Sequence, residues 1–494
     1  MKQKLVVVGN GMAGARAVEE VLARGGDALF DIVMFGEEPH GNYNRIMLSN
    51  VLSGSHDRRD IFINPRDWYA ENRITLHAGA RVTEIDRAAK VVASQDGIRE
   101  TYDTLLIATG SRPFVPPMAG LHDSEGRLKR GVFTYRTLDD VDAILGYARH
   151  AHVAATIGGG LLGLEAARGL KALGLESHVV HLAGHLLEVQ LDVVGGGLLR
   201  RAIEGMGLQV HLGKLTTAVQ GAEAVTGLTF KDGSRLACDM VVISAGIKPN
   251  SEIGLQAGLT VERAIVVDDH MRSIDDPDVY VVGECAQHRG RVYGLVAPLW
   301  EQAKVFADQV TGRNRGAAYH GSKLATKLKV SGVDVASMGL TEPAEERDEV
   351  LQFMETRRGT YKKLIVRDGR LVGGILMGDI SKAAYLMQAF DRDAPLPEER
   401  LALLFDLQAP DAAVTLAEMP ADMQICNCNG VTKGTIGACV SAGMTDPAAV
   451  MAATRGGMGC GSCKNSVAEL VAWFTEQRRA SAEERERVSR AEAA

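Results

Sequence analysis

Four cysteines in the C-terminal part of the chain have the spacing of a metal site. They form two pairs, Cys426-Asn427-Cys428 and Cys460-Gly461-Ser462-Cys463, with 31 residues between the pairs. Four thiolates arranged in this way can surround one zinc ion or complete the two irons of a [2Fe-2S] cluster. The spacing alone leaves these two sites, and spare thiols, as alternatives. Three other cysteines, Cys238, Cys285 and Cys439, are expected in the core.

Two sets of glycines could let the backbone approach phosphate groups closely. Each set has the spacing GxGxxG, follows a short apolar run and precedes a stretch that favours helix. A strand, a glycine turn and a helix N-terminus together offer unpaired N–H groups and a positive dipole end to a pyrophosphate. Two such units predict two dinucleotide sites in one chain, at Gly9, Gly11 and Gly14, and at Gly158, Gly160 and Gly163.

Different residue types follow the next β segment after each glycine set. The segment Asp31 to Phe35 leads to Glu37, which lies where a dinucleotide fold places the acid that binds a ribose. The corresponding segment Ser177 to Leu182 carries His181, where an acid would favour NADH and a nearby arginine NADPH. The preference between NADH and NADPH therefore stays open.

Length and composition restrict the class of protein. The chain has 494 residues, 46% of them hydrophobic and 24% charged, as expected for a folded protein of several domains. Its formal net charge of -7 gives no basic excess for nucleic acid. No apolar run is long enough to cross a membrane, and the N-terminus does not have the pattern of a signal peptide. We expect a cytoplasmic protein that binds neither nucleic acid nor membrane.

The secondary-structure pattern changes after about residue 318. Two β-rich segments follow, with Asp368-Gly369 as a hairpin signal between strands, which predicts an α+β domain over 319–400. A proline-containing connection leads to the cysteine-rich module at 422–476, and the charged tail 477–494 has no apolar face.

Several motifs taken in order resemble FAD-dependent pyridine nucleotide reductases. Besides Gly9, Gly11, Gly14 and Glu37, they are Tyr102 to Ser111, Ala245 to Asn250, and Val279 to Glu284. The resemblance implies that FAD binds at the first glycine set and NAD(P)H at the second, in an inserted domain. It places the FAD-binding domain at 1–117 and 245–318 and the NAD(P)H-binding domain at 118–244. It also implies cofactor contacts from Thr109, Gly110, Gly246, Gly283, Glu284 and Arg45.

Departures from this family narrow the prediction. Gly41 to Gly54 contains no cysteine, which excludes the dithiol mechanism of the disulfide reductases. Ferredoxin-reductase-like relatives have a flavin-side lysine where this chain has Asn50. Glu284 stands where the family has aspartate, and the longer carboxylate could still accept a hydrogen bond from the flavin ribityl group. Glu165 matches a glutamate near the nicotinamide and flavin of relatives, and is our candidate catalytic residue; a helix-surface carboxylate is the alternative.

The segment Cys426 to Trp473 resembles the bacterioferritin-associated ferredoxin-like [2Fe-2S] domain, which favours a cluster over zinc at Cys426, Cys428, Cys460 and Cys463. The whole order of domains resembles the N-terminal half of assimilatory nitrite reductase large subunits and the electron-transfer subunits of assimilatory nitrate reductases. That resemblance implies transfer of electrons from NAD(P)H through FAD and the cluster to a nitrate or nitrite reductase catalytic partner. The sirohaem half that reduces nitrite is not expected in this chain.

We therefore predict an α/β protein with two Rossmann-like dinucleotide-binding domains, an α+β interface domain and a small helical [2Fe-2S] module. A homodimer is compatible with this organisation. The alternative functions are an NADH oxidase-like flavoprotein and a flavoprotein whose cysteine module is a zinc docking domain.

Overall fold

A computed structural model describes residues 2–330, 332–405, 419–426, 429–458, 461 and 463–492. Its first large sheet has eight strands in the order β23-β20-β21-β22-β9-β1-β2-β5. The central strand β1 (Gln3–Val8) lies parallel to β2 (Phe30–Gly36) and to β9 (Thr104–Ile107). Continuous apolar strands such as Leu5 to Val8 require cover on both faces, and α1 (Met12–Ala23) and α8 (Val296–Thr311) contribute to that cover.

The other strands of this sheet come from two distant parts of the chain. These strands are β5 (Thr75–Ala78), β20 (Ile265–Val267), β21 (Arg272–Ser273), β22 (Asp276–Val281) and β23 (Ala286–His288). A separate antiparallel sheet lies beside them, with strands β6 (Val82–Asp86), β7 (Val91–Ser94) and β8 (Arg99–Thr101). Smaller elements are β3 (Asn42–Tyr43), β4 (Phe62–Asn64), α2 (Leu48–Leu52), α3 (Arg66–Glu71) and α7 (Glu252–Gln256).

A second, wholly parallel sheet has the order β11-β18-β12-β13-β14. Its strands are β11 (Val132–Thr134), β12 (Val153–Ile157), β13 (Glu176–Val180), β14 (Gln209–His211) and β18 (Met240–Ile243). The associated helices are α4 (Leu138–Ala148), α5 (Leu161–Ala172) and α6 (Val193–Gly205). A three-stranded sheet of β15 (Thr216–Gln220), β16 (Gly227–Phe230) and β17 (Arg235–Ala237) completes this part. The pair β10 (Ser111–Pro113) and β19 (Ile247–Pro249) lies where the chain leaves the first sheet and returns to it.

The next part is a five-stranded antiparallel sheet followed by helix α9 (Ala383–Asp391). Its strands, in the order β24-β25-β28-β27-β26, are β24 (Ala325–Val330), β25 (Val333–Gly339), β28 (Arg370–Met377), β27 (Thr360–Arg367) and β26 (Glu349–Glu355). One hydrophobic cluster contains Tyr361 and Met377 of this sheet together with Leu198 and Leu199 of α6. The antiparallel sheet therefore packs against the domain with the second glycine set.

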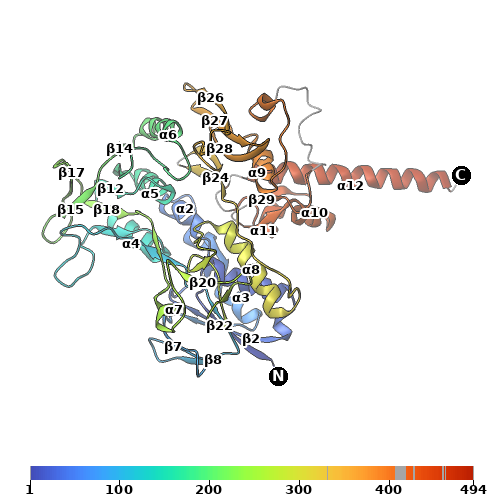
Figure 1. Cartoon of the computed structure of the whole chain (residues 1–494), viewed down its shortest axis with the longest axis horizontal. Coiled ribbons are helices and arrows are strands. Elements are labelled where there is room, and N and C mark those ends of the chain that lie inside the picture. Colours follow the sequence, from blue (N-terminus) through green and yellow to red (C-terminus); the bar gives the residue numbers. More distant parts are fainter. Residues whose placement is uncertain are drawn as a thin grey trace.

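The cysteine-rich module is small and mainly helical. It contains β29 (Gln424–Cys426), β30 (Val431–Thr432), α10 (Lys433–Ser441), α11 (Pro447–Thr454) and α12 (Lys464–Glu492). In Figure 1 the module lies beside α8, and the far end of α12 extends away from the rest of the molecule. The predicted charged tail is thus the continuation of α12 as far as Glu492.

This architecture confirms the predicted fold class, while the exact domain limits stay predictions. Among the residues that the structure describes, no helix combines the length and apolar character of a membrane span.

Candidate functional site

The first glycine set lies between β1 and α1. Gly9 has a φ of 120°, and a methyl group there would come within 2.2 Å of the Ala108 carbonyl oxygen. A methyl group at Gly14 would come within 2.1 Å of the Gly9 carbonyl oxygen, so this glycine allows the helix to approach the turn. Gly11 differs, because its missing side chain would meet nothing within 4 Å. Two glycines therefore shape the loop, and the third leaves open space at the N-terminus of α1.

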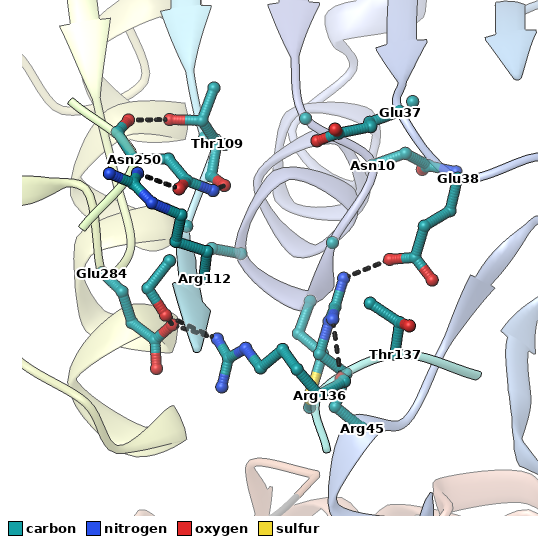
Figure 2. Close-up of a pocket in the computed structure, with 18 of the residues that line it drawn as sticks. Asn10, Glu37, Glu38, Arg45, Thr109, Arg112, Arg136, Thr137, Asn250 and Glu284 are labelled. Atoms are coloured by element: carbon teal, nitrogen blue, oxygen red, sulfur yellow. Dashed lines mark hydrogen bonds and ion pairs between the residues drawn. The ribbon is translucent and has the colours of Figure 1, made fainter. Parts of the chain in front are cut away.

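That open space belongs to a cavity of about 1110 Å³. The cavity extends from the glycine loop between the two Rossmann-like parts and reaches the antiparallel sheet, as its lining by Ala325, Thr326 and Lys327 shows. Eight of the predicted site residues line it, namely Gly9, Gly11, Glu37, Arg45, Thr109, Gly110, Glu165 and Glu284. Figure 2 shows the polar side chains that surround it.

Glu37 follows the end of β2 at the rim of this cavity. Its carboxylate lies 3.6 Å from an Arg81 guanidinium nitrogen, and its side chain is 65% exposed. The carboxyl end of β2 and the N-terminus of α1 are the positions that hold ribose and pyrophosphate in a dinucleotide-binding fold.

Arg45 is held by Glu38, the residue that follows Glu37 in the sequence. Glu38 is not among the predicted site residues. Arg45 donates to the Glu38 carboxylate at 2.5 Å and to the Arg136 carbonyl oxygen at 3.0 Å. The Tyr43 hydroxyl donates to the other Glu38 oxygen at 2.6 Å, and burial raises the pKa of Tyr43. These bonds fix the Arg45 guanidinium at the wall of the cavity (Figure 2).

Glu284 takes part in a second polar cluster on the opposite side of the cavity. Its carboxylate accepts hydrogen bonds from the Ser111 hydroxyl at 2.6 Å and from the Arg136 guanidinium. Arg136 also donates to the Ser111 hydroxyl at 2.9 Å. Only 8% of Glu284 is exposed, so the arginine compensates a carboxylate that would otherwise be costly to bury.

The motif residues at the ends of β9 and β19 are joined to each other. The Thr109 hydroxyl donates to the Asn250 carbonyl oxygen at 2.7 Å, and the Asn250 side chain donates to the Thr109 carbonyl oxygen at 3.0 Å. The Asn250 N–H donates to the Gly110 carbonyl oxygen at 2.9 Å. Gly246 precedes this contact in the returning strand, and Gly283 is tied to α8 through its N–H and Gln302. Neither Gly246 nor Gly283 lines the cavity.

Two buried polar atoms in the cavity wall have no hydrogen-bond partner within the described part of the chain. They are the Tyr135 hydroxyl and Nε of Arg136. A buried polar group without a partner is costly, so such atoms commonly mark the position of a bound group. Burial, and then the negative charge of Glu165, raise the pKa of Tyr135 well above its usual range. Glu165 therefore lies near this hydroxyl, at the cavity.

The cavity fits FAD by these observations. The open side of Gly11 suits a pyrophosphate, Glu37 a ribose, and the partnerless donors of Tyr135 and Arg136 a polar ring system. The lysine expected at position 50 in related reductases is absent here, but Lys327 of the antiparallel sheet lines the same cavity.

The second glycine set repeats the first almost contact for contact. Gly158 has a φ of 127°, and a methyl group there would lie 2.1 Å from the Ser244 carbonyl oxygen. A methyl group at Gly163 would lie 2.0 Å from the Gly158 carbonyl oxygen, and one at Gly160 would meet nothing within 4 Å. This loop lies between β12 and α5 and fits a second dinucleotide, NAD(P)H.

His181 lies beneath this second loop. Its Nδ1 accepts a hydrogen bond from the Gly159 N–H at 3.0 Å, so the ring proton is on Nε2, which contacts the Glu188 carboxylate at 2.9 Å. The residue is only 7% exposed. The structure thus shows His181 supporting the loop backbone, and its direct contact with a nucleotide stays a prediction.

The four candidate cluster ligands are only partly described. Cys426 and Cys463 are both buried and belong to one hydrophobic cluster with Val431, Ile436 and Val467. The structure therefore brings together one cysteine from each predicted pair. Cys428 and Cys460 lie outside the described residues.

Sequence reasoning missed the residues that hold the predicted ones in place. Arg136 and Glu38 are ordinary charged residues in the sequence, and they gain significance only from their contacts with Glu284 and Arg45. Glu38 had one available signal, because it directly follows Glu37, the predicted ribose-binding acid.

Comparison with protein-family models divides the chain in the same order. Residues 3–305 match the pyridine nucleotide-disulphide oxidoreductase family. Residues 325–394 match the rubredoxin NAD+ reductase C-terminal domain, and residues 424–473 match the BFD-like [2Fe-2S] binding domain. These matches confirm the predicted cofactors FAD, NAD(P)H and a [2Fe-2S] cluster.

Curated relatives extend the likeness over nearly the whole chain. A nitrite reductase [NAD(P)H] of Bacillus subtilis (strain 168) is 43% identical over 95% of this chain and 57% of its own length. The assimilatory nitrate reductase electron transfer subunit of the same organism is 40% identical over 96% of this chain and 60% of its own length. The chain therefore spans less than two thirds of the length of these relatives.

A solved structure supports the fold. The covalent putidaredoxin reductase–putidaredoxin complex matches with a TM-score of 0.73 and 24% identity, covering 81% of this chain and 97% of that one. The repeated glycine loops, the cavity and the family match agree with one another. The chain belongs to the pyridine nucleotide-disulphide oxidoreductase family.

Proposed function

We propose that this chain takes electrons from NAD(P)H and passes them through FAD and a [2Fe-2S] cluster to the catalytic centre of an assimilatory nitrate or nitrite reductase. The observation that carries the proposal is the presence of two dinucleotide loops and a cluster-binding module in one chain. The names of the two Bacillus subtilis relatives supply the acceptor.

The residues of this chain would bind and orient the two nucleotides. The loop at Gly11 and the acid Glu37 would hold the FAD pyrophosphate and ribose, and the loop at Gly160 would hold NAD(P)H. The Glu284–Arg136–Ser111 cluster would fix the ribityl and ring region. Since α5 begins beside the second loop and carries Glu165 into the cavity, it connects the two sites.

When bound, FAD would accept a hydride from NAD(P)H and a proton from solvent, and would then give up two electrons, one at a time, to the cluster, with release of two protons. Protein groups need only position the two rings and exclude water, so no acid and base pair is required. Glu165, near the Tyr135 hydroxyl, is the proposed residue at the meeting point of the two rings.

Cys460→Ser tests the electron route. We expect loss of the cluster with retention of FAD, because the ligands and the flavin cavity are in different modules. Ferricyanide reduction by NADH should survive, while electron transfer to an added nitrate or nitrite reductase partner should fail. The matched control is Cys439→Ser, a substitution in the same module outside the proposed ligand set, which should retain both activities.

Iron and zinc analysis of the purified chain separates the alternatives. Iron with inorganic sulfide, and a visible absorption that bleaches on addition of NADH, would agree with the proposal. Zinc in place of iron would support a docking module, and rapid NADH oxidation by oxygen alone would support an oxidase. Either of these results would contradict the proposed electron route.

A further inference from the structure

The wall of the flavin cavity and the cysteine module meet at one tryptophan. Leu299, in the first turns of α8, lines the cavity, and Trp300 is the next residue. The backbone of Gly430 lies against the Trp300 ring, since a methyl group on Gly430 would be 3.1 Å from Cδ1 of the indole. Gly430 is two residues after Cys428 in the sequence. One turn of α8 thus contacts the cavity on one side and a cysteine-bearing loop on the other.

Arg455 joins the module to the FAD-binding part next to this contact. It donates to the Ile63 carbonyl oxygen at 3.0 Å and lies 3.5 Å from both the Glu19 carboxylate and the Asn64 side-chain oxygen. Glu19 is on α1, the helix that begins at the FAD glycine loop. The anchor therefore reaches from the module to the helix and strand that border the first dinucleotide site.

The backbone conformation of Arg455 indicates that the surrounding structure holds this residue in place. Its φ of 61° is in the left-handed region, which is unfavourable for a residue other than glycine. Its carbonyl oxygen accepts a hydrogen bond of 2.6 Å from Asn429, the residue that follows Cys428. The turn after α11 is therefore bound both to the FAD-binding part and to the first cysteine loop, five residues before Cys460.

The same face of α1 completes the contact. The Arg16 guanidinium lies 5.4 Å from the centre of the Trp300 ring and is itself held by Glu20 at 2.6 Å. Trp300 is only 6% exposed. The ring is thus enclosed between α1 and the module, and water is largely excluded from the contact.

We propose that Arg455 is a positioning residue that holds the loop with Asn429 and Gly430, which follows Cys428 in the sequence, against Trp300. In this docked arrangement, electrons pass from the flavin to the cluster. This inference rests on the proposed function. In each transfer the reduced flavin loses one electron and the cluster gains it, and one NAD(P)H supplies two such electrons. Electron-transfer rates fall steeply with distance, so release of the loop should slow this step and no earlier one.

Anaerobic stopped-flow reduction of the full chain by NADH tests the proposal, because flavin and cluster bleaching can be followed separately. For Arg455→Ala we expect flavin reduction at the wild-type rate and cluster reduction slowed about tenfold, which corresponds to ~1.4 kcal/mol in the activation free energy. Glu19→Ala should slow the same step from the other side of the contact while leaving the cysteine loops unchanged. The control is Arg59→Ala, an 88% exposed arginine of the FAD-binding part, with no effect on either rate.

The rate of cluster reduction in the double variant, Arg455→Ala with Glu19→Ala, distinguishes loss of one specific contact from general destabilisation. If Arg455 and Glu19 act through one contact, the double variant should be no slower than Arg455→Ala alone. Iron content checks that each variant retains its cluster, and Glu19→Ala decides the question if Arg455→Ala loses it. Cluster reduction at the wild-type rate in iron-replete Arg455→Ala and Glu19→Ala would overturn the docking proposal, with the electron route intact. Failure of NADH to reduce the wild-type cluster would instead overturn the proposed function itself.

Discussion

The two dinucleotide loops have the same glycine geometry but different polar ends. At the first, Glu37 is an exposed carboxylate after β2. At the second, the equivalent region after β13 has the buried His181, whose ring binds the loop and orients the carboxylate of Glu188. The glycines are repeated because both loops must bring backbone N–H groups to a pyrophosphate.

The largest expected difference between the loops comes from the glycines with positive φ. Gly9→Ala should abolish FAD binding, because the added methyl group overlaps the Ala108 carbonyl and the backbone angle is unfavourable. Gly158→Ala should keep FAD but slow reduction of the flavin by NADH about 100-fold, equivalent to ~2.7 kcal/mol. Flavin content after gel filtration and single-turnover rates measure the two effects. Equal loss of FAD in both variants would show that the loops do not act separately.

The second difference between the two loops is an anchor beside the second one, where Asp192 joins α6 to the antiparallel sheet. Asp192 begins α6, and its carboxylate accepts hydrogen bonds from Tyr361 at 2.5 Å and from Lys363 at 2.9 Å, both in the antiparallel sheet. Asp192→Asn leaves the buried Lys363 paired only with Glu342, at 2.6 Å, and should lower the free energy of unfolding by about 2 kcal/mol. Asp232→Asn, in a surface pair with Lys214, should lower the free energy of unfolding much less.

The pH dependence of this anchor has a definite sign. Burial would raise the pKa of Asp192, but hydrogen bonds from Tyr361, Gly195 and Lys363 outweigh it and lower the pKa below the usual value of 3.8. A lowered carboxyl pKa stabilises the folded state at pH values above the unfolded pKa, and this contribution is lost as the pH falls through the folded pKa. The difference in unfolding free energy between wild type and Asp192→Asn should therefore be constant near neutral pH and shrink below about pH 4. Urea titrations at several pH values would show it, and a difference that grows towards acid would contradict this origin.

Substitution of Gly11 or Gly160, the glycine of each loop set whose added methyl group would meet no atom within 4 Å, should have a smaller effect on nucleotide binding. Gly11→Ala and Gly160→Ala meet no protein atom, so the melting temperature without nucleotide should not change. Gly11→Ala should weaken FAD binding, and Gly160→Ala should raise KM for NADH, each by about tenfold or ~1.4 kcal/mol. Calorimetry and steady-state kinetics separate the two. A lower melting temperature in the absence of nucleotide would mean that these glycines serve the fold as well.

The smallest expected effect concerns the choice of coenzyme. His181 to Gln190 contains no arginine or lysine to bind a 2′-phosphate, and the Glu188 carboxylate would repel one. We expect kcat/KM for NADH to equal or exceed that for NADPH, and Glu188→Gln to move the ratio about threefold towards NADPH, or ~0.7 kcal/mol. Glu176→Gln, at the other end of β13, is the control. A tenfold preference of the wild type for NADPH would reverse the assignment.

Features that depend on neighbouring residues could be predicted from the sequence. The glycine spacing reports a local requirement of each strand–helix turn, and both loops were found from it. The position of Glu37 directly after β2 could be predicted for the same reason, while its contact with a ribose stays a prediction. The fold class followed from these units and from the family motifs around Thr109 and Glu284.

Contacts between distant segments could not be found in this way. Arg136 and Glu284 are 148 residues apart in the chain, and no local pattern relates an arginine after β11 to a carboxylate after β22. The buried orientation of His181 depends on its contact with Gly159 on the facing loop. Arg455 gave no signal because a left-handed arginine is not visible in a sequence, and because Glu19 and Ile63, which its side chain contacts, are in a distant part of the chain.

The interrupted first sheet has a consequence for the order in which the protein folds. The Ser111–Glu284 contact joins residues 173 positions apart, and strands β9 and β22 meet only when the later part of the chain is present. The second sheet lies wholly within the interrupting segment, so during synthesis it can become complete first. Contacts of such long sequence separation form slowly and leave the apolar edge of β9 exposed until its partner arrives. The FAD pocket should therefore be among the last regions to mature, and newly made chains should acquire a folded nucleotide-binding insertion before they can retain flavin.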